Sequence, residues 1–140
     1  MKQIFYCLFI SFCIVSCDDS HENHAITDYE GLAIEIMWDE TGAKNADGIG
    51  LVIYDPQGVL IYAGQDSLAI FHSLMDGQYV CEVFTYKQVD KTDYKIEVQG
   101  LNDKAIHTFT NSFSKSDTVG FKKRSLLILK NKERYTVDVP

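Results

Sequence analysis

The fold class is decided by the eight residues LAIEIMWD, at positions 32–39. Apolar side chains recur there at every second position, with Leu32, Ile34 and Ile36 separated by smaller or charged residues. Successive side chains of a strand point to opposite faces, whereas the apolar face of a helix repeats every three to four residues. The stretch therefore predicts a β-strand with one buried face.

The same alternation extends along the rest of the chain. It predicts further strands at 49–54, 59–63, 68–72, 79–86, 94–99, 106–113, 125–129 and 135–139. The sequence Asp55-Pro56-Gln57-Gly58 suits a type I turn, and Asp76-Gly77 and Asn102-Asp103 mark further reversals. About eight or nine short strands, with no amphipathic helix between them, predict an all-β fold. We expect an antiparallel β-sandwich of jelly-roll or immunoglobulin-like type.

The first 16 residues, MKQIFYCLFISFCIVS, have the pattern of an export signal. A single cation, Lys2, precedes an uncharged apolar run at 4–15, which is shorter than the roughly 20 residues of a membrane-spanning helix. The last three residues of this segment and the cysteine that follows, Ile14-Val15-Ser16-Cys17, resemble the lipobox of bacterial lipoproteins. The resemblance implies cleavage before Cys17 and attachment of diacylglycerol and a fatty acid such as palmitate to that residue. Two or more acyl chains anchor a protein stably to a bilayer.

Three segments follow from this interpretation. Residues 1–16 are the predicted lipoprotein signal peptide, 17–30 a lipidated acidic tether, and 31–140 the β-sandwich domain. The predicted location is the bacterial cell envelope, at the outer membrane, on its periplasmic face or at the cell surface. Cys7 and Cys13 leave with the signal, so Cys81 remains as the one free thiol. Its place in an alternating run predicts a small buried side chain rather than a nucleophile.

Two acidic segments carry side chains able to bind divalent metals. In the tether these are His21 and His24, beside Asp18, Asp19 and Glu22. In the first long loop they are Asp39, Glu40 and Asp47. Solvated flexible residues are the favoured interpretation of both segments, and no metal or cofactor is predicted. Whether the loop binds calcium stays open.

A family resemblance covers about residues 31–138. The segments 34–39, 50–58, 76–83 and 94–98 look like the β-sandwich modules of the bacterial pre-peptidase C-terminal type, with a strand ending before an aspartate turn and a glycine and tyrosine opening a later strand. That resemblance implies a binding or spacing unit rather than an enzyme. The chain departs from the family's run of aspartates, since Asn45, Ala46 and Gly48 flank a single Asp47. Separately, Tyr79 is similar to an immunoglobulin tyrosine corner, which predicts a hydroxyl bonded to backbone.

Catalytic patterns are few in this sequence. His72 and His107 fall within predicted strands, and the chain has no Gly-x-Ser-x-Gly motif, phosphate-binding glycine loop or zinc signature. We therefore predict no enzymatic activity. An envelope enzyme that uses His72 or His107 as its base is the alternative.

Charge favours some partners over others. The chain carries a net charge of −7, and removing Lys2 with the signal leaves about −8, so nucleic acid is an unfavourable partner. Cations concentrate near the C-terminus, at Lys122, Lys123 and Arg124 among others. If the last hairpin forms a sheet edge, these cations block edge-to-edge pairing. Alternatively, they bind an anionic surface or an acidic partner.

The predicted function is a lipid-anchored, non-catalytic envelope β-sandwich that binds a protein or glycan partner. A structural spacer within a surface complex is a further alternative. The oligomeric state and the identity of the ligand stay open.

The lipid anchor gives a direct prediction. Cells that express the protein and are fed labelled palmitate should incorporate label into the wild type, and Cys17→Ala should abolish it because the acylated thiol is lost. Cys81→Ala is the matched control and should be labelled like the wild type. Label that persists in Cys17→Ala would contradict the lipobox interpretation.

Overall fold

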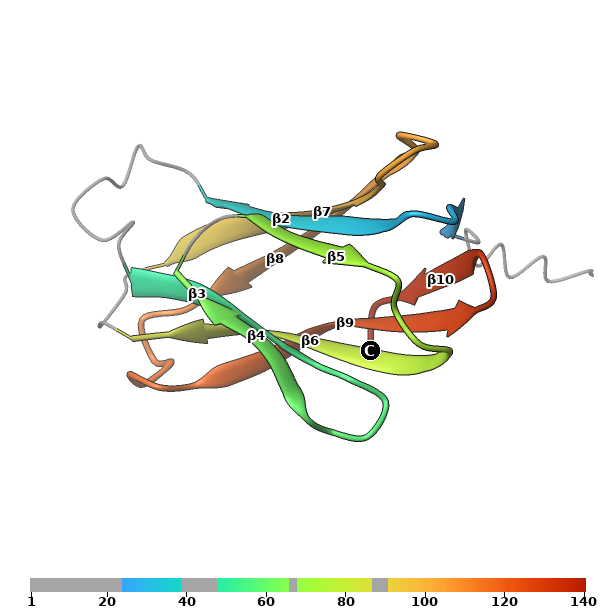
Figure 1. Ribbon diagram of the computed structural model, residues 1–140. Coiled ribbons are helices and arrows are strands. Elements are labelled where there is room, and N and C mark those ends of the chain that lie inside the picture. The colour runs from blue at the N-terminus through green and yellow to red at the C-terminus, as the bar shows by residue number, and fades with distance from the viewer. Residues whose placement is uncertain (1–23, 39–47, 66–67, 87–90) are drawn as a thin grey trace, which may run out of the picture.

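A computed structural model describes residues 24–38, 48–65, 68–86 and 91–140. These residues form ten antiparallel strands arranged as two facing layers (Figure 1). The strands are β1 (Ala25–Thr27), β2 (Gly31–Trp38), β3 (Ile49–Tyr54), β4 (Leu60–Gly64), β5 (Leu68–His72), β6 (Gly77–Thr85), β7 (Thr92–Gly100), β8 (Ile106–Phe113), β9 (Lys122–Asn131) and β10 (Arg134–Asp138). The predicted all-β antiparallel sandwich is confirmed.

One layer is a six-stranded sheet in the order β1-β10-β9-β6-β3-β4, and the other is a four-stranded sheet in the order β5-β2-β7-β8. Nine of the ten strands overlap those predicted by the period-two pattern. The tenth, β1, lies inside the segment predicted to be a tether, where Ala25 pairs with Thr136 and Thr27 with Arg134. The sandwich thus begins before residue 31, and three residues are too few to show a period.

Within the described part of the chain, no helix is long and apolar enough to cross a membrane.

Strand alternation places the core between the layers. In the four-stranded sheet, Ile34 of β2 pairs with Val98 of β7, and Ile36 pairs with Ile96, all four side chains being buried. In β6, Cys81 has no exposed surface, and its burial raises the pKa of the thiol to about 12. The prediction that Cys81 is a buried packing residue is confirmed.

The last hairpin does not form a sheet edge. Strand β9 lies between β10 and β6, and β10 is itself covered by β1. The edges of the six-stranded sheet are β1 and β4, and those of the four-stranded sheet are β5 and β8. Strand β10 pairs only with Leu127–Asn131, so Lys122, Lys123 and Arg124 lie on the part of β9 that pairs with β6 alone. That these cations block edge-to-edge pairing stays a prediction. The short strand β1, which the pattern missed, occupies the position that would have exposed the hairpin.

Two local predictions are confirmed. In the 55–58 turn, the Gly58 N–H donates to the Asp55 carbonyl at 2.9 Å, and Gly58 adopts the left-handed region with φ +77. The Tyr79 side chain is 3% exposed, and its hydroxyl donates to the Met75 carbonyl at 2.8 Å. That bond fixes the chain before β6 as a tyrosine corner does.

The buried carboxylate of Asp28, which lies between β1 and β2, joins the start of β2 to the β7–β8 turn of the same sheet. One oxygen of Asp28 accepts hydrogen bonds from the N–H groups of Glu30 (2.8 Å) and Gly31 (3.1 Å). The other accepts from Asn102 (2.6 Å) and Asp103 (2.8 Å), in the β7–β8 turn. Burial by itself raises the pKa of this carboxyl, but the four donors outweigh burial and hold the pKa below 3.8.

Asp28→Asn should destabilise the fold by about 3 kcal/mol, because the amide nitrogen cannot accept the two N–H groups that one carboxylate oxygen now binds. Since the folded pKa lies below 3.8, the carboxylate's contribution is present above that pH and is lost as pH falls through the folded pKa. Urea unfolding at neutral and acidic pH measures both effects.

The control is Asp103→Asn, because Asp103 contributes only its backbone N–H to this cluster and its side chain is exposed. That change should alter stability by less than about 0.5 kcal/mol. Equal unfolding midpoints for Asp28→Asn and the wild type would contradict the assignment.

Candidate functional site

The sandwich has two unlike ends. Strand β1 and Asp28 lie at one end, where β1 pairs with the 134–136 part of β10. Trp38, which pairs with Tyr94, and Lys122, which pairs with Phe84, lie at the other. Along β9 the two ends are roughly 25 Å apart at about 3.3 Å per residue. We call the end with Trp38 and Lys122 the distal end; it is at the left in Figure 1, where β2 ends and β9 begins.

The distal end is braced by contacts between the two layers. The Tyr94 hydroxyl of β7 lies 3.0 Å from the Ser125 hydroxyl of β9, and burial raises the pKa of Tyr94. The Lys123 ammonium donates to the Ser112 carbonyl of β8 and lies 5.3 Å from the centre of the Phe113 ring. Side chains of both layers thus join β7 and β8 to β9 at this end.

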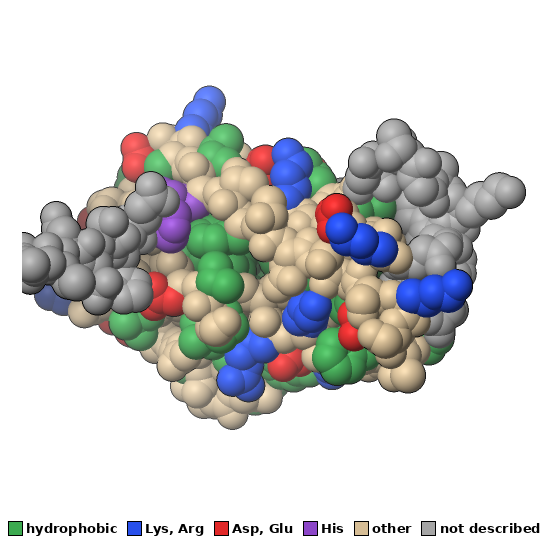
Figure 2. Space-filling view, turned by 180° about the vertical axis from the view of Figure 1, so that it is seen from behind, with side chains coloured by type: hydrophobic (Ala, Val, Ile, Leu, Met, Phe, Trp, Pro, Cys, Tyr) green, Lys and Arg blue, Asp and Glu red, His purple; other side chains and the backbone are tan. Residues whose placement is uncertain are grey.

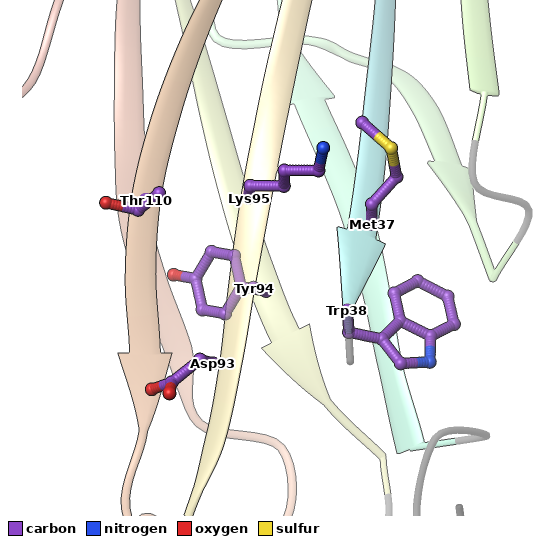
Figure 3. Close-up of a pocket in the computed structure, with 6 residues that line it drawn as sticks. All are labelled: Met37, Trp38, Asp93, Tyr94, Lys95 and Thr110. Atoms are coloured by element: carbon purple, nitrogen blue, oxygen red, sulfur yellow. The ribbon is translucent and has the colours of Figure 1, made fainter. Parts of the chain in front are cut away.

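A pocket of about 310 Å³ opens at the distal end of the four-stranded sheet (Figure 3). The indole of Trp38 and the thioether of Met37 come from β2, and Tyr94 and Lys95 from β7. Its remaining lining residues are Asp93 and Thr110. The surface is mainly apolar with a polar rim, and the volume is at the small end of ligand sites. Such a surface suits one sugar ring or one side chain of a partner.

The rim of this pocket is charged on both sides. Lys95 pairs with Glu97 at 3.2 Å, and Figure 3 shows its ammonium reaching toward Met37. Asp93 points away from Trp38 in the same view. The pocket thus offers an apolar floor between an ammonium and a carboxylate.

The three predicted cations do not form one surface. Lys122 donates to the Tyr54 hydroxyl at 2.8 Å, on the outer face of the six-stranded sheet. Lys123 points the other way, to the Ser112 carbonyl, as strand alternation requires. On the face that Figure 2 shows, Lys and Arg side chains (blue) are scattered among acidic and other residues. The structure therefore separates Lys123 from the other two cations, while Lys122 and Arg124 share the outer face beside Tyr54.

Arg124 lines a shallow groove of about 460 Å³ on the outer face of the six-stranded sheet. Glu82, which is Arg124's partner in the sheet register, shares this groove with Tyr54 and with the 55–58 turn. The acidic and basic side chains oppose each other there, so the groove favours no single charge on a ligand.

The two histidines of the enzyme alternative lie far apart. His72 is exposed on β5 and His107 is half-buried on β8, at opposite edges of the four-stranded sheet. Three strand spacings of about 4.8 Å separate such edges. His107 instead faces His24, with 3.3 Å between their Nδ1 atoms. The two residues therefore do not share one catalytic site.

Several predicted residues lie outside the described part of the chain. They are Cys7, Cys13, Cys17, Asp18, Asp19, His21, Glu22, Asp39, Glu40 and Asp47. Among the residues that the structure describes, no group of three or more His, Cys, Asp or Glu side chains is placed to hold a metal ion.

Comparisons with family models, with curated proteins and with solved structures found no match to this chain. The resemblance to pre-peptidase C-terminal modules stays a prediction.

Sequence reasoning missed the Trp38 pocket. The alternating pattern indicates only that Trp38 is the last apolar residue of a strand. Trp38 is also the single tryptophan of the chain. Its position immediately before a polar loop was the available signal, because a large aromatic ring at a strand end is only partly covered. Apart from its neighbour Met37, the other residues that line the pocket come from β7 and β8. Which of their residues lie beside Trp38 depends on strand register, which a single sequence does not specify.

The contacts of Lys123 give a further prediction. Lys123→Ala should lower the free energy of unfolding by about 1 to 2 kcal/mol, because a charge-assisted hydrogen bond and a cation–π contact are lost. Arg124→Ala should change it by less than about 0.5 kcal/mol. Urea denaturation of both variants measures the difference, and equal losses would show that Lys123 does not brace the distal end.

Proposed function

We propose that this protein is a lipid-anchored, non-catalytic module of the bacterial cell envelope that binds a protein or glycan partner at its distal end. The observation that carries the proposal is the Trp38 pocket, which lies at the end of the sandwich remote from β1. An anchor on Cys17 is followed closely by β1. Because seven residues separate Cys17 from β1, our proposal puts the pocket at the end of the domain farther from the anchor.

The contacts beneath the pocket favour binding over catalysis. Tyr94, which forms part of the wall, already uses its hydroxyl on Ser125. Lys95, on the rim, is paired with Glu97. A rigid apolar floor with charged groups at its rim binds a ligand without a conformational rearrangement. The alternative enzyme and spacer functions have no comparable feature to support them in this pocket.

The test places a photo-crosslinking amino acid at one of two exposed threonines in cells that make the protein. Thr110 lines the pocket, and Thr27 lies on β1 at the other end. We expect adducts with an envelope protein or polysaccharide from position 110 and none from position 27. Trp38→Ala should reduce the yield at position 110 about tenfold or more, as loss of a central aromatic contact does.

Tyr29→Ala is the matched control for the loss of an aromatic ring, because Tyr29 is 65% exposed and lies near β1. It should leave the adducts unchanged. Adducts that form only at position 27, or that survive Trp38→Ala in full, would contradict binding at the distal end. Protein adducts and polysaccharide adducts are distinguished by protease and glycosidase digestion.

A further inference from the structure

We propose that His24 and His107 form a binding site for a divalent transition-metal ion of the kind that prefers imidazole, such as Zn²⁺. The two residues are 83 positions apart in the chain and meet where β1, the edge of one sheet, approaches β8, the edge of the other. This site lies at the end of the sandwich opposite the Trp38 pocket and is independent of the proposed partner binding.

The distance between the two nitrogens suits a shared ion. The Nδ1 atoms of His24 and His107 lie 3.3 Å apart. Zinc binds imidazole nitrogen at about 2.0–2.1 Å with tetrahedral angles, so two nitrogens on one ion lie about 3.3 Å from each other. The pair can therefore accept the ion between its lone pairs with little movement of either ring.

The orientation of the rings agrees with the distance. Their centroids are 5.1 Å apart. Rings that pointed straight at each other across this gap would have centroids about 5.6 Å apart, whereas rings that converge on one tetrahedral ion would have them about 5 Å apart. The observed centroid distance of 5.1 Å is close to the value for converging rings.

A backbone carbonyl fixes the proton on His107. Its Nε2 lies 3.3 Å from the Ala25 carbonyl oxygen, which only accepts hydrogen bonds, so Nε2 carries the proton. Neutral His107 then presents an unprotonated Nδ1, and His24 donates to it from its own Nδ1 in the absence of metal. Histidine ligands of metals are oriented in this way by a bond from their second nitrogen. A tautomer change at His24 frees its Nδ1 for the ion without changing the charge of the ring.

The surroundings hold both rings in place. The His24 carbonyl accepts a hydrogen bond from the Val137 N–H at 2.9 Å, which fixes the backbone beside β10. The Phe109 ring packs edge-on against His24 with centroids 5.0 Å apart. His24 and His107 are both half-buried, so part of each ring is open to solvent. Water completes the coordination, and the ion fastens β1 to β8 across the side of the sandwich.

Calorimetric titration of Zn²⁺ into the purified full chain, after treatment with a chelator, tests the site. The chain has four histidines, which allows matched double variants. We expect one ion per chain in the wild type and in the His21→Ala, His72→Ala double variant. The His24→Ala, His107→Ala double variant should bind at least about tenfold more weakly. Zinc should also raise the melting temperature of the first two proteins and not of the third.

Two results would overturn the proposal: no saturable zinc binding by the wild type, or equal affinity in the His24→Ala, His107→Ala variant. Circular dichroism shows whether that variant is folded. If it is not, nuclear magnetic resonance of the wild type decides, since Zn²⁺ should shift the ring signals of His24 and His107 and leave those of His72 unchanged. Ring signals of His24 and His107 that do not move would equally overturn it.

Discussion

Asp28 is the constraint that ties the two sheets together at one end of the sandwich, through its carboxylate on one side and its backbone N–H on the other. The carboxylate accepts four backbone N–H groups, two from the entry to β2 and two from the β7–β8 turn, and the Asp28 N–H donates to the Glu133 carbonyl at 2.8 Å. The side chain joins the start of β2 to the β7–β8 turn, and the backbone N–H joins both to the β9–β10 turn of the other sheet. A Cβ on Gly100 would come within 2.8 Å of a carboxylate oxygen, which shows how closely the chain packs around the charge. A buried charge is tolerated only where donors satisfy it in full.

The two ends of the sandwich are held by different chemistry. At the Asp28 end, an anion is bound by backbone donors, and the His24–His107 pair joins the edges of the two sheets nearby. At the distal end, a hydroxyl pair and the Lys123 ammonium join the sheets through side chains. The first end leads to the chain segment that carries Cys17. The second supports the pocket, so the end proposed to meet a partner is held by interactions separate from those at the end nearer the proposed anchor.

Sequence patterns predicted strands well where one face of a strand is buried. Strand β2 shows this, because Leu32, Ile34 and Ile36 are all buried while Glu35 and Met37 face outward. They failed at β1, whose three residues have only Ile26 in the core. The prediction of one cationic surface also failed. Adjacent residues of one strand point to opposite faces, so Lys122 and Lys123 do not share a surface. The pocket required the register of β2 on β7, which long-range pairing decides.

The sequence by itself determined nine of the ten strands, the turns at 55–58 and 102–103, the buried state of Cys81 and the backbone bond of Tyr79. Each of these follows from alternation or from the conformational preferences of neighbouring residues. Only the tertiary structure decided that Asp28 belongs to the core of the fold, that β9 is internal, and that His24 meets His107. Those facts depend on which strands become neighbours. That choice is made by packing between segments far apart in the chain, and no local pattern records it.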